Sequence, residues 1–263
     1  RFHIIVAMRL LILADTSGLG RLDYSSLSQL TLLEMFSDGI ENKGSIWKDD
    51  EQPTGIEGYR NVLWNGNCEI IDIRWQMYGL RGTVSFEWLP ATLEKIRLSF
   101  NKLKCTVDMT RLPSTLMRVQ LCKNDFFGAL DLCHLPDGMT DFSIFHNKLT
   151  GNLDLTSLPS PLLTLYLSHN LFEGSIDLTS LPDEMCSLDV SHNSLRGPLN
   201  LTRLPMKLGS LFLSKNDFCG TADFSQLPDS LHNLTMESTC LCGVIHLPSG
   251  THKQFSAAGS NVE

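Results

Sequence analysis

Residues 162–182 read LLTLYLSHNLFEGSIDLTSLP, and this stretch decides how the chain folds. Its leucines alternate with polar residues up to Asn170, and a period of two indicates a short strand with one buried face. Gly174 can adopt backbone angles closed to residues with a side chain, and Pro182 ends extended structure because it lacks an N–H donor. The stretch therefore predicts one strand, a bend and a returning segment.

The same unit recurs every 23 residues along most of the chain. The asparagine that follows the strand keeps this interval without a slip, at Asn101, Asn124, Asn147, Asn170, Asn193 and Asn216. Leu-Pro pairs and glycines form two further columns at the same interval, with Cys105 in place of glycine once. An amide side chain both donates and accepts, so we expect the asparagines to satisfy main-chain groups of their own and neighbouring turns. A strict period of this length predicts a solenoid.

The repeat resembles that of the leucine-rich repeat family, whose consensus LxxLxLxxNxLxGxL is matched nearly letter for letter over about residues 68–245. The continuation is similar to the extracellular repeats of plant receptors and protist surface proteins, and the Leu-Pro pair also resembles bacterial effector repeats. The resemblance implies an α/β solenoid, mainly β. Its right-handed superhelix would carry a parallel sheet on the concave face and short turns or 3-10 segments on the convex face.

Degenerate units flank the regular ones and bring the expected number of turns to about eight. Tyr78 stands in the asparagine position of the first unit and Thr239 in that of the last. Terminal repeats are atypical in solenoids because one side has no partner and needs capping. We therefore expect a capping segment at residues 1–63, the repeat domain at residues 64–245 and a frayed tail at residues 246–263.

Within the capping segment, residues 25–36 read as a helix with Ser25 or Ser26 as its N-cap. The run WNGNC at residues 64–68 resembles the cap that leads into the first strand of plant-type and protist repeat proteins. The apolar run at residues 4–13 is shorter than the ~20 residues of a membrane span, so no transmembrane segment is expected. It is either the remnant of a signal peptide or an element that packs onto the body.

Residues between the consensus leucines point out of the sheet, so the candidate binding face can be identified from the sequence. This face is basic in the first repeats and becomes aromatic and rich in histidine in the middle. Tyr, Phe and Arg are enriched at interface hot spots, which favours a protein or peptide ligand over an idle solvated surface. The candidate contact residues are Lys95, Arg97, Phe100, Arg118, Lys123, Phe145, His146, Tyr166, His169, His192, Phe212 and Lys215. Nucleic acid is not an expected partner, because a net charge of -8 would repel a polyanion.

Three other columns could carry chemistry. His146, His169 and His192 fall in successive turns about 5 Å apart, and a straight ladder converges poorly on a metal ion, so a pH-sensitive patch is favoured over zinc. Cys219 and Cys242 lie one period apart, which would allow a disulfide, although both would stay reduced in a reducing compartment. The third column consists of Asp108, Asp131, Asp154, Asp177 and Asp223, with Asn200 in register. Its spacing to the residue two positions on predicts structural Asx turns and not a calcium site.

No nucleophile, acid–base pair or phosphate-cradling loop is visible, and no cofactor or metal ion is implied. The leading hypothesis is a non-catalytic recognition module, secreted or at a cell surface, that binds a protein through the concave face. An intracellular structural subunit of a large assembly is the alternative. A third hypothesis is an enzyme regulator, or an effector whose catalytic domain lies outside this sequence.

Overall fold

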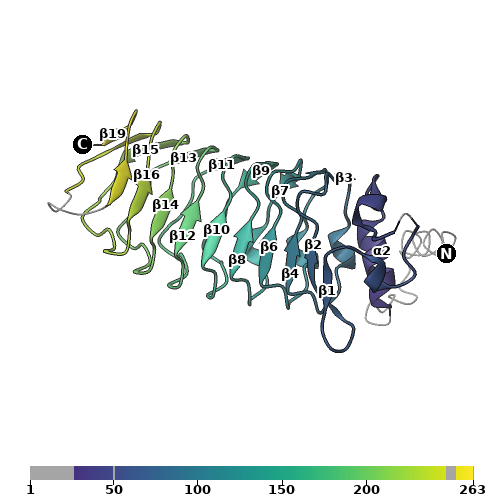
Figure 1. Ribbon diagram of the computed structural model, residues 1–263. Helices are drawn as coiled ribbons and strands as arrows, with labels where there is room; N and C mark the ends of the chain where they lie inside the picture. The colour runs from purple at the N-terminus through teal and green to yellow at the C-terminus, as the bar shows by residue number, and fades with distance from the viewer. Residues whose placement is uncertain (1–26, 50, 247–252, 263) are drawn as a thin grey trace, which may run out of the picture.

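The computed structural model describes residues 27–49, 51–246 and 253–262. This part of the protein is a β-solenoid, with helix α2 (Gln29–Ser37) at one end and strands β18 (Gln254–Ser256) and β19 (Asn261–Val262) at the other (Figure 1). None of the described helices is long and apolar enough to cross a membrane. The apolar run at residues 4–13 and the candidate caps Ser25 and Ser26 lie outside the described residues.

One strand of each turn joins a ten-stranded sheet, as the alternating leucines predicted. The sheet is parallel except where β1 pairs antiparallel with β2. Neighbouring parallel strands through the regular turns pair in register with the sequence period, so that Leu165 lies opposite Phe142 and Leu188, all fully buried. In sheet order the strands before β18 are β1 (Val62–Trp64), β2 (Ile70–Arg74), β4 (Lys95–Arg97), β6 (Arg118–Gln120), β8 (Asp141–Ser143), β10 (Thr164–Tyr166), β12 (Ser187–Asp189), β14 (Ser210–Phe212) and β16 (Asn233–Thr235).

A second strand in most turns was missed by the sequence analysis, which expected one strand per repeat. These strands form a seven-stranded sheet that ends at β19, and a separate pair near the first turns consists of β3 (Arg81–Gly82) and β5 (Lys102–Leu103). Here the paired residues are 21 positions apart, as in Phe172 opposite Gly151, so the ladder is skewed by two residues relative to the repeat. Its members before β19 are β7 (Phe127–Ala129), β9 (Lys148–Asn152), β11 (Leu171–Gly174), β13 (Ser194–Gly197), β15 (Asp217–Thr221) and β17 (Cys240–Gly243).

The side of the solenoid that leads to the Leu-Pro pairs is built of short segments, as the family resemblance implied. The early turns carry 3-10 helices and the later ones only turns. Each Leu-Pro pair ends in a tight turn in which the proline carbonyl accepts from the residue three positions on, for example Leu162 N–H to Pro159. The 3-10 helices are η2 (Lys43–Ile46), η3 (Ile56–Gly58), η4 (Phe86–Trp88), η5 (Met109–Arg111) and η6 (Leu132–His134).

The asparagine column joins consecutive turns through buried hydrogen bonds. The Nδ2 group of Asn170 donates to the Leu167 carbonyl in its own turn (3.1 Å) and to the Ile144 carbonyl in the preceding turn (3.2 Å). Its Oδ1 accepts from the backbone N–H of Leu149 at 3.1 Å. The other five members make equivalent bonds. The predicted role of this column in satisfying main-chain groups is therefore confirmed.

The N-terminal cap packs aromatic rings onto the first turn. Phe36 of α2 stacks on Trp75 at 6.0 Å between ring centroids, and the Trp75 Nε1–H donates to the Arg60 carbonyl at 2.8 Å. Helix α2 begins later than predicted, because the Ser28 hydroxyl accepts from the Thr31 N–H and forms the N-cap. The predicted boundary at residue 64 falls inside β1, so the cap contributes a strand to the main sheet.

The C-terminal segment is not the frayed tail that we expected. Residues 254–256 form β18 beside β16, and residues 261–262 form β19 beside β17. This turn places Phe255 opposite Leu234, a separation of 21 residues, so a search at period 23 does not find it. The Ser260 hydroxyl donates to the Ala257 carbonyl just as that of Thr239 donates to Met236, and both hydroxyls take over part of the asparagine's role.

Candidate functional site

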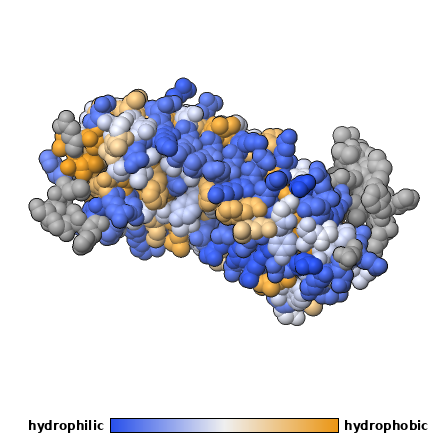
Figure 2. Space-filling model, turned by 45° about the horizontal axis from the view of Figure 1, so that its top comes forward, coloured by the Kyte–Doolittle hydropathy of each residue, from blue (hydrophilic) through white to orange (hydrophobic). Residues whose placement is uncertain are grey.

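The outward face of the ten-stranded sheet contains a groove with a volume of about 570 Å³. Phe100, Phe145 and Tyr166, three of the predicted contact residues, lie along it, together with the exposed side chain of Met77. The remaining lining is mostly polar: Gln76, Ser99, Gln120, Cys122, Asp141, Ser143 and Thr164. Apolar surface bordered by convergent polar groups is the usual chemistry of a recognition site. In the view of Figure 2 the surface is mainly hydrophilic, with hydrophobic side chains gathered in small patches.

Two arginines at the basic end of this face share one acidic partner. The Arg97 guanidinium bonds both carboxylate oxygens of Asp72 (2.8 and 2.7 Å), and Arg74 reaches the same carboxylate at 2.8 Å. Asp72 is buried, so the two arginines satisfy a charge that would otherwise be costly. Part of the cationic character that the sequence indicated for this end is therefore offset within the protein.

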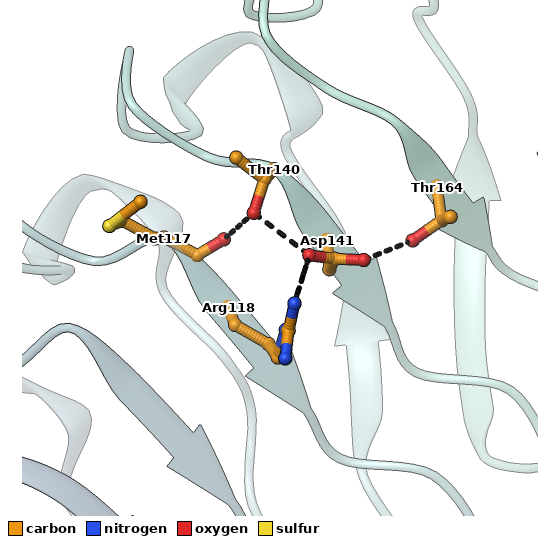
Figure 3. Close-up of polar contacts among 5 residues, drawn as sticks. All are labelled: Met117, Arg118, Thr140, Asp141 and Thr164. Carbon is orange, nitrogen blue, oxygen red and sulfur yellow. Dashed lines mark hydrogen bonds and ion pairs between the residues drawn. The ribbon is translucent and has the colours of Figure 1, made fainter. Parts of the chain in front are cut away.

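A second charged cluster lies on β6, β8 and β10 beside the groove (Figure 3). Asp141 accepts from Arg118 Nη2 at 2.9 Å, from the Thr140 hydroxyl at 2.8 Å and from the Thr164 hydroxyl at 2.9 Å. Burial raises the pKa of Asp141, but these hydrogen bonds outweigh burial and hold the pKa below its usual value. The carboxylate therefore stays ionised and fixes Arg118 against the sheet.

The residue immediately before each asparagine has a left-handed backbone, which the sequence analysis did not predict. In the six regular repeats its φ lies between 52° and 61°, and Met77 and Ser238 extend the series at either end. We call the six regular members the left-handed column: Phe100, Lys123, His146, His169, His192 and Lys215. Such a φ is unfavourable for β-branched residues, and none occurs in these eight positions. That absence was the signal available in the sequence.

Several side chains of the left-handed column contact their neighbours in the next turn. The rings of His146 and His169 lie 4.5 Å apart between centroids and those of His169 and His192 lie 3.8 Å apart, in line with the predicted spacing. The Lys123 ammonium lies 5.0 Å from the centroid of the Phe100 ring. Burial, followed by the neighbouring imidazoles, lowers the pKa of His169, and burial followed by Lys215 lowers that of His192.

The structure separates some of the predicted contact residues from the groove. Lys95 on β4 and Phe212 on β14 are half-buried and do not line it, and Lys215 lies still further along the stack. The lining also does not include Arg97, Arg118, Lys123, His146, His169 or His192. The groove instead uses residues that were not predicted as contacts, above all Met77, Ser99 and Cys122. Met77 directly precedes the asparagine position of its turn, and Ser99 and Cys122 each directly precede a left-handed residue, so all three could have been found from the repeat.

The aspartate column is structural, as predicted. In each case an Oδ1 accepts from the backbone N–H two residues on, at 3.0 Å for Asp108 with Thr110 and 2.8 Å for Asp177 with Thr179, and Asn200 does the same with Thr202. Hydrogen bonds from Thr179 lower the pKa of Asp177. Among the described residues, no group of three or more His, Cys, Asp or Glu side chains could hold a metal ion.

The predicted partnership of Cys219 with Cys242 is wrong in register. Because the second sheet is skewed, Cys219 lies opposite Cys240, and Cys242 lies opposite Thr221. All eight cysteines of the sequence fall in the described part of the chain and are free thiols there. The repeat spacing alone could not reveal a two-residue skew in a sheet that the sequence did not predict.

No protein-family model and no curated protein matches this sequence. Solved structures do. The leucine-rich repeat ectodomain of the plant membrane receptor kinase GASSHO1/SCHENGEN3 from Arabidopsis thaliana, in complex with CASPARIAN STRIP INTEGRITY FACTOR 2, superposes with a TM-score of 0.61 at 17% identity. That match covers 89% of this chain and 33% of the ectodomain, so this chain spans about a third of its length.

Two further structures are matched over nearly their whole length. A structure of Pollen Receptor Kinase 3 has a TM-score of 0.55 at 21% identity and covers 77% of this chain and 97% of the other. A plant ice-binding protein has a TM-score of 0.52 at 18% identity, covering 89% and 94%. At these identities the likeness concerns the fold alone. Together with the 23-residue repeat and its asparagine ladder, it identifies this chain as a leucine-rich repeat solenoid.

Proposed function

We propose that this solenoid is a non-catalytic recognition module that binds a protein or peptide through the face of the ten-stranded sheet. The observation that carries the proposal is the groove flanked by Phe100, Phe145 and Tyr166. The Phe100 side chain is 46% exposed and that of Met77 is 74% exposed. Aromatic side chains that remain accessible on a rigid sheet bind a partner with little loss of conformational entropy. The receptor ectodomain complexed with CASPARIAN STRIP INTEGRITY FACTOR 2 shows that the fold is compatible with a bound ligand.

Selection of binders from a displayed random-peptide library tests this proposal, because no partner needs to be known in advance. Peptides enriched on the wild-type protein should lose at least roughly tenfold in affinity for Phe100→Ser, since a hot-spot aromatic contributes more than about 1.4 kcal/mol. Phe127→Ser is the matched control. Phe127 is 42% exposed but belongs to β7 in the second sheet. An equal loss in both variants, or no enrichment on the wild-type protein, contradicts the proposal.

A further inference from the structure

Five consecutive members of the left-handed column are basic or can become so: Lys123, His146, His169, His192 and Lys215. We call these five residues the cationic row. The ring contacts at 4.5 and 3.8 Å show that the three imidazoles lie side by side across three turns, with a lysine in the next turn at each end. The row therefore places two lysines and three imidazoles in one line across five turns.

The three imidazoles make no hydrogen bond to any group in the described part of the protein. Those of His146 and His169 are exposed, and that of His192 is half-buried. His134 and His232 differ in this respect. His134 is bonded through Nδ1 to Asp131 at 2.6 Å, and His232 contacts the Ser230 carbonyl. The ring nitrogens of the row therefore remain available to a ligand.

The charged groups around the three histidines carry both signs. The acidic group whose field reaches both His169 and His192 is Asp189 on β12, and Lys215 acts on them with the opposite sign. Asp189 is already engaged by the Ser191 hydroxyl at 2.6 Å. On the neighbouring elements, Asp141 is paired with Arg118 on β6, and Lys148 of β9 is paired with Asp125 at 2.6 Å. The other charged groups there are Glu173 of β11, Arg196 of β13, Asp217 at the start of β15 and Glu237 after β16.

We propose that the cationic row binds an acidic, extended peptide segment of the partner and takes up protons as it does so, while an apolar side chain of that segment enters the neighbouring groove. This inference rests on the proposed function and adds to it the chemistry of the ligand. Carboxylates of the ligand would attract each imidazolium group and offset the repulsion between neighbouring imidazolium groups. Each histidine would therefore hold its proton more tightly in the complex. By linkage, affinity must then rise as pH falls.

The hydroxyl groups beside the row favour a peptide over an acidic polysaccharide. Ser191 donates to Asp189, and the Ser214 hydroxyl accepts from the Glu237 N–H at 3.0 Å. Both serines are buried. They are therefore poorly available to sugar hydroxyls, whereas the groove in the preceding turns offers apolar surface from Phe100, Phe145 and Tyr166 for a hydrophobic side chain.

The test is fluorescence anisotropy of the full chain with a short labelled peptide of glutamates that contains one phenylalanine. The same peptide with glutamine in place of glutamate is the matched probe. Affinity for the glutamate peptide should be roughly tenfold higher at about pH 5.5 than at about pH 7.5, because uptake of one proton gives up to tenfold per pH unit. The glutamine peptide should show no such change. Circular dichroism at both pH values establishes that the protein stays folded.

Variants locate the effect. His169→Gln and the double variant His146→Gln/His192→Gln should lose most of the pH dependence, whereas His134→Gln, which alters a histidine outside the row, should keep it. Binding that does not change with pH overturns the inference, and so does equal affinity for polygalacturonate. Library peptides that depend on Phe100 but carry no acidic residues would overturn this inference alone and leave the proposed function standing. A wild-type protein that binds neither library peptides nor the glutamate probe would contradict both.

Discussion

The Nδ2 group of Asn170 lies 3.2 Å from the carbonyl oxygen of Ile144, a residue 26 positions earlier in the chain. This contact joins two turns across the bend at which the strand of the main sheet ends. Asn170 is buried, and the same side chain also serves its own turn and the Leu149 N–H. The asparagine ladder therefore replaces water at bends that are closed to solvent.

Replacement of this asparagine should be strongly destabilising. Asn170→Ala leaves buried main-chain groups without partners, and we expect the free energy of unfolding to fall by about 2–3 kcal/mol. Urea unfolding followed by circular dichroism measures the loss. Asn152→Ala removes the same amide from an exposed position and should change stability by less than about 0.5 kcal/mol. Similar losses in the two variants would contradict the assigned role of the ladder.

The left-handed column imposes a second constraint that can be tested at His169, where φ is 53°. His169→Val should destabilise the fold by roughly 1 kcal/mol more than His169→Asn, because a β-branched side chain clashes in this conformation and asparagine adopts it readily. The comparison uses chemical unfolding at about pH 7.5, where the imidazole is neutral. If valine is tolerated as well as asparagine, the backbone at this position differs from the one described.

The stability of the fold should fall as the pH falls below about 6.5, the value for an unperturbed histidine. His169 and His192 have a lowered pKa in the folded state, so the unfolded chain takes up protons that the folded chain resists. The full contribution of these two histidines to the free energy of unfolding is present above their pKa in the unfolded chain. It is lost as the pH falls through their pKa in the folded protein. Unfolding midpoints between about pH 7.5 and pH 5 measure this slope. The double variant His169→Gln/His192→Gln should have a smaller slope, whereas His134→Gln should match the wild type.

Oxidation should join Cys219 to Cys240 and not to Cys242. The first two are paired across β15 and β17, where a strand spacing of about 4.8 Å lies within the Cα range of a disulfide. Treatment with a small-molecule disulfide such as oxidised glutathione converts both thiols to one disulfide and releases two molecules of the reduced reagent. Mass spectrometric mapping identifies the linked peptides. Cys240→Ser should abolish the link and Cys242→Ser should leave it intact; the reverse result would show that the skew of the second sheet is misassigned.

The sequence predicted those parts of the fold in which one residue type serves one purpose. Asparagine, glycine, the Leu-Pro pair and the aspartate column each recur at the repeat interval because each satisfies a fixed backbone requirement. The C-terminal turn was missed because it closes in 21 residues and uses Ser260 where asparagine is expected. The start of α2 was missed because three serines precede it, and only the structure shows that Ser28 caps it.

The candidate site was predicted less completely, for reasons of geometry. The alternation of buried and exposed positions identified Phe100, Phe145 and Tyr166, which do lie along one groove. It could not show that Asp72 and Asp141 would take up the charges of Arg97 and Arg118, because those contacts depend on side-chain conformations across strands. Nor could it reveal the second sheet, whose skew decides which cysteines face each other.

The bonds that join each asparagine of the ladder to the preceding turn reach a carbonyl 26 residues earlier in the chain and an N–H 21 residues earlier. If one whole repeat is removed or duplicated, every remaining asparagine still meets a carbonyl and an N–H at those separations. The loss of a single residue within a repeat changes these separations for every bond that crosses the deletion, so the asparagine of that turn no longer meets its partners. Evolution can therefore lengthen or shorten this sheet far more readily by duplication or deletion of a whole repeat than by insertion or deletion of single residues.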